Sequence, residues 1–170
     1  NWDHFTQLTN NLMKANIIKS VKDLWWDVRP HPGFGTVEIR ACDIPITFEK
    51  ILSLIALIQA LVLTVKDKKD CPNTHIQILE SNKWQALRYG LEGTFIDPLT
   101  FEQFTMRKAI ENLCNLVEPA IISLNLVKYF KIIEDILING TGSTTQRRLY
   151  KNSGNFEYMI QSLKDQFFQL

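Results

Sequence analysis

Side chains suited to phosphate or metal chemistry crowd into one short stretch of the sequence. They are two acids, two arginines and a histidine, namely Asp27, Arg29, His31, Glu38 and Arg40. If the second part of the stretch is a strand, Glu38 and Arg40 project to the same face, about 6.6 to 7 Å apart. A carboxylate and a guanidinium in that arrangement could hold a divalent ion and the phosphate oxygens that the ion bridges.

The segment from Gly35 to Cys42 has the alternation of a β-strand. One face would carry Thr36, Glu38 and Arg40, and the other Val37, Ile39 and Ala41. Alternation alone favours the solvated face of a half-exposed antiparallel strand over a site. No partner strand is recognisable, and a lone strand leaves its backbone groups unpaired, so its neighbours are expected in sequence outside this chain.

The segment ahead of this strand, residues 21–32, is predicted to be irregular. The residues that break a helix there and just beyond are Pro30, Pro32, Gly33 and Gly35. His31 could serve as a general base, although a loop histidine without a partner is more often structural or solvated. Asp27 could orient Arg29 or simply form a turn.

Helices are expected to make up most of the chain. Periodicity and stop signals place them within residues 1–16, 47–65, 75–89, 101–117, 124–138, 144–151 and 155–168. Asp3 and Thr47 are the expected caps of the first two. A charged loop at 66–73 and a short extended piece at 93–97 complete the order.

Bulk composition fits one domain spanning residues 1–170. The 19 basic and 18 acidic residues give a net charge of +1, which offers no strong field for nucleic acid or an anionic membrane. The apolar run Ile51–Val65, about 15 residues, is shorter than the roughly 20 that cross a bilayer, so a buried core helix is expected.

Cysteine usage indicates a reducing, cytoplasmic setting. The three cysteines are an odd number at wide spacings, without the paired spacing of a zinc site: Cys42, Cys71 and Cys114. The chain opens without an initiator methionine or a targeting segment, so we expect it to be part of something longer.

Residues 25–43, WWDVRPHPGFGTVEIRACD, resemble the central motif of type 2 glutamate-cysteine ligases and related carboxylate-amine ligases. The likeness continues through residues 45–47, then NKWQALRYGLEG at 82–93, and then residues 146–147 and 153–154. It covers essentially the whole chain. The resemblance implies an α+β fold, the C-terminal portion of a glutamine-synthetase-like fold with few antiparallel strands packed by several helices.

The resemblance also implies an ATP-dependent reaction with magnesium. ATP would phosphorylate a substrate carboxylate, and an amine would attack the acyl phosphate to give an amide, ADP and phosphate. In the prototype the acid is glutamate and the amine is cysteine, as in glutathione biosynthesis. Phosphoryl transfer depends mostly on positioning and on neutralising oxygen charge, which suits arginines and metal ligands.

Five residues receive roles on this basis. Glu38 is the expected metal ligand, Arg40 would contact ATP and the transferred phosphate, and Arg29 would hold phosphate or the substrate carboxylate in a bidentate grip. Arg88 would reach nucleotide or substrate, although it could instead pair with Glu92 four residues on. Asn82 would contact substrate, although it could instead cap the helix.

Members of this family carry further metal-binding acids in their N-terminal half, and no counterpart is present here. The chain is therefore expected to be the C-terminal part of the catalytic domain and inactive alone. The alternative is a non-catalytic helical binding or assembly domain, or a degenerate ligase. A homodimer through the helices is also expected. The tryptophans Trp25, Trp26 and Trp84 and the Phe101–Phe104 pair are expected to pack rather than to bind adenine.

Overall fold

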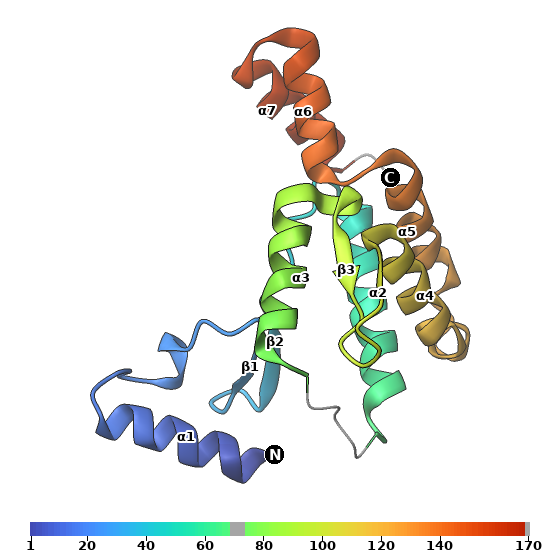
Figure 1. Ribbon diagram of the computed structural model, residues 1–170. Coiled ribbons are helices and arrows are strands. Elements are labelled where there is room, and N and C mark those ends of the chain that lie inside the picture. Colours follow the sequence, from blue (N-terminus) through green and yellow to red (C-terminus); the bar gives the residue numbers. More distant parts are fainter. Residues whose placement is uncertain (69–73, 169–170) are drawn as a thin grey trace. The chain divides into compact units, whose positions relative to one another are not determined.

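The computed structural model describes residues 1–68 and 74–168. The chain forms two compact units, Asn1–Ile44 (unit 1) and Pro45–Leu170 (unit 2), and each is described by itself. Both contain helices, and each contains one small antiparallel sheet (Figure 1). The expected α+β class is therefore confirmed. The expected loop at 66–73 and Cys71 lie mostly or wholly outside the described residues.

Unit 1 begins with a surface helix and ends with a hairpin. Its elements are α1 (Trp2–Lys14), the 3-10 turn η1 (Val21–Asp23), β1 (Val28–His31) and β2 (Thr36–Ile39). The cap of α1 is Asn1, whose side chain accepts from the His4 N–H at 2.9 Å. The prediction that Asp3 caps this helix was wrong, because Asp3 already lies in its first turn.

The predicted strand at 35–42 exists as the shorter β2, and its partner lies within this chain. β1 pairs with it antiparallel, Arg29 opposite Glu38 and Pro30 opposite Val37. The prediction that residues 21–32 are irregular holds for residues 24–27 but was wrong for 21–23, a 3-10 turn, and for 28–31, which form β1. The prediction that the partner strands lie elsewhere was wrong. A proline is compatible with β1 because both strands of a two-stranded sheet are edge strands, where a missing N–H can face outward.

Unit 2 contains six helices among its described residues. Its elements in order are α2 (Phe48–Val65), α3 (Ile76–Tyr89), the 3-10 turn η2 (Gly90–Glu92), β3 (Thr94–Ile96), β4 (Gln103–Thr105), α4 (Met106–Ser123), α5 (Val127–Asn139), α6 (Gly142–Ser153) and α7 (Phe156–Gln166). Thr47 caps α2 as predicted, accepting from the Lys50 N–H. Gly90 ends α3 as predicted.

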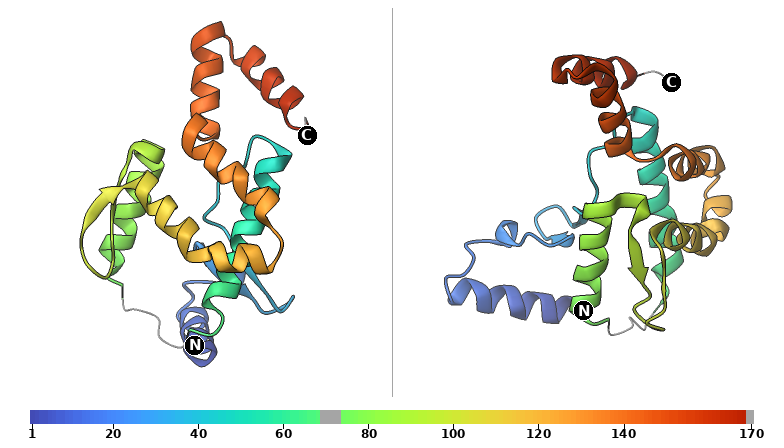
Figure 2. Two further views of the ribbon diagram at one scale, coloured as in Figure 1. Left: turned by 90° about the vertical axis from the view of Figure 1, so that its right-hand side faces the viewer. Right: turned by 45° about the horizontal axis from the view of Figure 1, so that its top comes forward.

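The core of unit 2 lies where α2, α4 and α5 pack side by side (Figures 1 and 2). Its fully buried members are small or β-branched, namely Ala60, Val117, Ala120 and Ile121. Larger, partly buried side chains of α2, α4 and α5 pack around this cluster, including Leu57, Leu113 and Phe130. Burial of this apolar surface stabilises the three helices as a group.

A second hairpin, β3–β4, packs against α3 and α4. The predicted helix 101–117 was therefore wrong at its start, because Gln103–Thr105 pairs with β3. Phe101 adopts a positive φ of 62° before this strand. The helix begins only at Met106, capped by Thr105, and continues through Pro119 to Ser123.

By length and composition alone, α2 could cross a membrane. It has 18 residues with a mean hydropathy of 1.9, and within the part of the chain that the structure describes it is the one such helix. The core helix of a water-soluble domain passes the same test. The expectation that this run is too short to span a bilayer rested on a 15-residue count that omitted the first turn of the helix.

Candidate functional site

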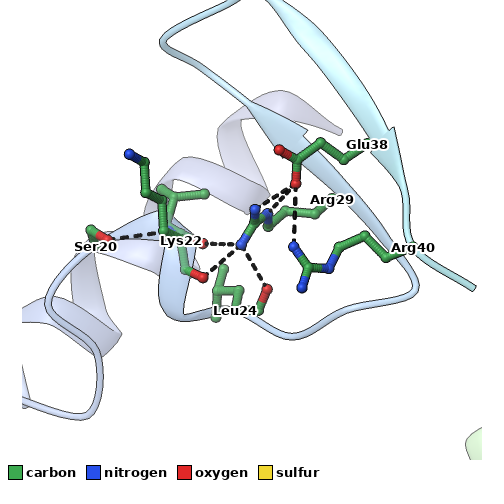
Figure 3. A network of polar contacts seen from close by, with 7 residues as sticks. Ser20, Lys22, Leu24, Arg29, Glu38 and Arg40 are labelled. Atoms are coloured by element: carbon green, nitrogen blue, oxygen red, sulfur yellow. Dashed lines mark hydrogen bonds and ion pairs between the residues drawn. The ribbon is translucent and has the colours of Figure 1, made fainter.

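The hairpin of unit 1 brings Arg29 and Glu38 into direct contact. The two residues are opposite each other in the β1–β2 register, so their side chains project from the same face. The Arg29 guanidinium donates from Nε at 3.0 Å and from Nη2 at 2.5 Å, both to Glu38 Oε2 (Figure 3). The sequence prediction that these groups lie together is confirmed by this geometry.

The third guanidinium nitrogen of Arg29, Nη1, binds backbone carbonyls of η1 and of Leu24, the residue that follows η1. Nη1 lies within hydrogen-bonding distance of three carbonyl oxygens, those of Val21 (3.3 Å), Lys22 (2.7 Å) and Leu24 (3.1 Å). The side chain is only 5% exposed. Arg29 is therefore used as a structural cation that ties the 21–24 turn to the hairpin, and it is poorly placed to receive a ligand.

A capping box creates the turn that binds Arg29. The Ser20 hydroxyl accepts from the Lys22 N–H at 3.2 Å, and Asp23 Oδ2 accepts from the N–H groups of Lys19 (2.7 Å) and Ser20 (3.0 Å). These backbone hydrogen bonds hold the pKa of Asp23 below its usual value. The Ser-x-x-Asp spacing is the signal that could have predicted this turn.

Arg40 is the accessible cation of the group. Its Nη1 lies 3.6 Å from Glu38 Oε2, and its guanidinium carbon is 5.9 Å from the centre of the Trp25 ring. The Arg40 side chain is 37% exposed. Trp25 is 84% exposed, so the prediction that it is a packing residue was wrong. An arginine bound on one side to a carboxylate and on the other to an aromatic face is pre-oriented for an incoming anion.

The Glu38 carboxylate is ionised and mostly neutralised by its neighbours. The hydrogen bond from Arg29, followed by the charges of Arg29, His31 and Arg40, lowers the pKa of Glu38. Both guanidinium contacts reach Oε2, and Oε1 points away from them (Figure 3). The face therefore offers one carboxylate oxygen and one accessible guanidinium.

Magnesium does not find a complete site on this hairpin. It prefers six oxygen ligands at about 2.0 to 2.1 Å, commonly with one or two carboxylates among them. Over residues 1–68 and 74–168, no group of three or more His, Cys, Asp or Glu side chains could hold a metal ion. Glu38 alone, already facing two guanidiniums, could supply at most one ligand.

His31 lies two residues after Arg29 in β1 and is held by packing. Its ring stacks on Phe34, with 4.5 Å between ring centres. Its Nδ1 is buried without a hydrogen-bond partner in the described structure. This contact favours the structural interpretation of His31 over that of a general base.

Asn82 belongs to unit 2 and lies in the middle of α3. Its amide donates to the Ile96 carbonyl and accepts from the Ile96 N–H, both at 2.8 Å. The alternative prediction that Asn82 is an N-cap was wrong, because the cap of α3 is His75. Both functional atoms of the amide are occupied by β3, so the residue joins the helix to the β3–β4 hairpin.

Arg88 is exposed on the last turn of α3. The alternative prediction that it pairs with Glu92 was wrong, because Glu92 Oε1 is 2.6 Å from Arg107 Nη2. Arg107 also donates to the Leu137 carbonyl, so it joins η2 and α4 to the end of α5. A surface arginine such as Arg88 remains available for a ligand.

The similarities to known proteins decide the family. The family described as glutamate-cysteine ligase family 2 matches residues 1–165. The chain belongs to this family. The expected kinship is thereby confirmed over nearly all of the chain.

Curated relatives of this ligase family are similar along the whole chain. A protein from Gloeobacter violaceus named "Putative glutamate--cysteine ligase 2" is 36% identical over 168 residues, 96% of this chain and 45% of its own length. A protein of the same name from Nitrosospira multiformis is 34% identical over 94% of this chain and 44% of its own length. This ligase-family chain thus spans about half the length of the relatives it matches.

The family-like segments that contain the candidate site residues lie in both units. The central motif at 25–43 includes β1, the turn and β2, all in unit 1, and the 82–93 block includes the second half of α3 and η2 in unit 2. Sequence reasoning missed the backbone carbonyls that occupy Arg29 and the ring beneath Arg40. Both involve contacts between residues 5 to 15 apart that no short spacing rule specifies.

Proposed function

We propose that the full-length protein containing these residues is an ATP-dependent carboxylate-amine ligase. It would join the γ-carboxyl of glutamate to the amine of cysteine through an acyl phosphate, as the first step toward glutathione in the cytoplasm. Membership of glutamate-cysteine ligase family 2 supports the ligase class. The observation that carries the chemistry is the accessible Arg40 guanidinium, oriented by Glu38 and Trp25.

In this proposal the residues of the hairpin have distinct roles. Arg40 neutralises charge on the phosphate being transferred, because it is the guanidinium that a ligand can reach. Arg29 is a positioning residue: its fork fixes the Glu38 carboxylate, which in turn holds Arg40. This replaces the expected grip of Arg29 on a substrate carboxylate, since its nitrogens already face carbonyls and Glu38.

ATP and magnesium are the proposed cofactors of the whole protein. Magnesium would supply charge neutralisation between the β- and γ-phosphates. Glu38 Oε1 would provide one ligand at most, and further carboxylates would have to come from the part of the ligase beyond these 170 residues. The role of Glu38 that rests on this chain alone is to orient Arg40.

Arg88 is the proposed contact for nucleotide or substrate in unit 2. It is exposed and lies in the family-like 82–93 block. Asn82 is proposed to act on substrate only indirectly, by fixing the position of β3 relative to α3. A direct substrate contact would require its amide to leave the Ile96 backbone.

The test uses the full-length protein with ATP, magnesium, glutamate and cysteine, and measures ADP release with and without the amine. We expect Arg40→Ala to lower kcat on the order of 100-fold, the effect of losing one oriented donor at a developing charge. Arg40→Lys should recover only part of it, because an ammonium cannot keep the same forked geometry. Lys131→Ala, on the exposed surface of α5, is the matched control and should be unchanged.

Three results would contradict the proposal or a part of it. No ADP release by the intact protein with a panel of acids and amines would leave the non-catalytic binding or assembly role. ADP release that does not depend on the amine would mean ATP hydrolysis in place of ligation. Equal activity of Arg40→Ala and the intact protein would remove Arg40 from the phosphate site while leaving the ligase class untouched.

A further inference from the structure

Helix α2 buries its small side chains and exposes large ones. Its buried residues are Ser53, Ala56 and Ala60. Phe48, Ile55 and Val62 are 37%, 47% and 56% exposed. Small residues let the α2 backbone approach α4 and α5 closely. On the opposite side the ring of Phe48 lies 6.3 Å from that of Phe168, whereas Ile55 and Val62 stay about half exposed in the described structure.

The exposed apolar residues lie in a row along one side of α2, with the exposed Gln59 between the last two. Phe48, Ile55 and Val62 recur every seven residues, so they lie on one side of the helix over about 21 Å at the usual rise. We call these three residues the outer stripe of α2. No charged side chain occurs between Lys50 and Lys66. A soluble surface rarely keeps an uncharged stripe of this length open to water.

A lipid bilayer is disfavoured as the cover of the outer stripe because α4 and α5, which pack against the other side of α2, carry exposed charges. Helices α4 and α5 lie beside α2 in the views of Figures 1 and 2. They carry exposed charges along their length, at Glu111, Glu118, Lys131 and Glu134. If α2 crossed a bilayer, these charges would enter the hydrocarbon with it, at a cost of about 2.5 to 3.5 kcal/mol or more for each central charge. Protein is the better cover.

The length of the relatives indicates which protein segment covers the outer stripe. This chain spans 45% of the Gloeobacter violaceus relative, so more than half of that relative lies outside the match. A second copy of this chain in a symmetric dimer would cover only one self-complementary patch. Large apolar side chains are exposed in both units, including Trp25 and Val37 in unit 1 and Leu87 in unit 2, so more than one patch needs a cover.

We propose that the outer stripe of α2 is an internal interface, covered by the part of the ligase chain that lies outside these 170 residues. The proposal rests on the packing of α2 and the length of the relatives, and it is independent of the ATP chemistry above. Its failure would therefore leave the proposed function standing.

Photo-crosslinking in the full-length protein identifies the cover directly. The photo-reactive amino acid p-benzoylphenylalanine replaces Ile55 or, in a second variant, Val62, and cross-linked peptides are read by mass spectrometry. We expect cross-links to peptides from outside residues 1–170, at a yield at least tenfold above that of the same amino acid at Glu111, an exposed position of α4. Half of the protein is isotopically labelled, so that links between copies can be recognised.

Each other result overturns the proposal. Cross-links to residues 1–44 would assign the cover to unit 1, and links between labelled and unlabelled copies would assign it to a dimer. Links to added phospholipid vesicles would assign it to a membrane. Because a bulky residue could disturb folding, Ile55→Cys is also tested with a maleimide: we expect labelling at least tenfold slower than for Glu111→Cys, and equal rates would show an open surface.

Discussion

The two units of this chain differ in the deepest side chains that they bury. In unit 2 the interior of α2, α4 and α5 is apolar, with Val117 and Ile121 essentially inaccessible. In unit 1 the charged Arg29 is buried as deeply as the apolar Ile18 and Leu24. Meanwhile the apolar face of the hairpin, with Val28 and Val37, is more than half exposed.

The difference teaches what each unit can tolerate. Removing a core methyl group from unit 2 weakens close packing between helices, a loss spread over many small contacts. Removing one group from the network of unit 1 leaves polar atoms without partners, a loss concentrated in a few strong contacts. A ligand-facing arginine needs the second kind of environment, because a guanidinium is oriented by a few specific partners, here the Glu38 carboxylate and the Trp25 ring beside Arg40.

The largest effect is expected from the apolar core of unit 2. Ile121→Ala should lower the free energy of unfolding of the full-length protein by about 3 kcal/mol, since it deletes buried methyl groups and leaves a cavity at a side chain only 2% exposed. Chemical denaturation measures it. Ile122→Ala, at the 63% exposed neighbour, is the control and should change stability by less than about 0.5 kcal/mol. Equal losses would mean that the three-helix core is not the stable centre of unit 2.

Next in size is the polar network of unit 1. Arg29→Ala should lower local stability by about 2 kcal/mol, because it leaves three carbonyls and Glu38 without their donor. Arg40→Ala removes only a half-exposed ion pair and should lower it by less than about 1 kcal/mol. Hydrogen exchange of the β1–β2 amides reports both. If Arg40→Ala loosens the hairpin as much as Arg29→Ala, the division into structural and accessible arginines is wrong.

A smaller effect is expected from the two hydrogen bonds by which Asn82 joins α3 to the β3–β4 hairpin in unit 2, here called the polar clamp. Asn82→Asp keeps the acceptor for the Ile96 N–H but turns a second oxygen toward the Ile96 carbonyl. We expect a loss of about 1 to 2 kcal/mol, read as faster exchange of β3–β4 amides. Gln85→Glu, whose oxygen already accepts from the Thr94 N–H, keeps that hydrogen bond and should have little effect. Unchanged exchange in Asn82→Asp would show that the clamp does not hold β3.

The smallest expected effect is the pH dependence of the stability of unit 1, which differs from that of unit 2. Because the pKa of Glu38 is lowered by Arg29, its stabilising contribution is complete above the ordinary glutamate pKa of about 4.3 and is lost as pH falls through the lowered value. Asp23 behaves in the same direction. Amide chemical shifts of β1 and β2 in an NMR titration should therefore change at lower pH than an ordinary glutamate, and Glu38→Gln should abolish that step. Glu111→Gln in unit 2 is the control, and a step that survives Glu38→Gln would assign it to another group.

Local sequence signals predicted most helices well. Thr47 before an apolar run, Gly90 after α3 and Gly154 after α6 mark boundaries that hold in the structure, because caps and glycines with positive φ act over one helical turn. The elements that sequence reasoning missed were two strands. β1 and β4 carry no alternation long enough to recognise, and each exists because a partner strand pairs with it.

The sequence by itself determined that Glu38 and Arg40 lie on one face of a strand, with Arg29 nearby. Only the tertiary structure decided their roles. The 21–24 turn folds back so that its carbonyls surround Arg29, which leaves Arg40 as the guanidinium open to an anion. The physical reason is that spacing along a strand fixes the face on which a side chain lies, whereas contacts from other segments decide whether its hydrogen bonds are already made.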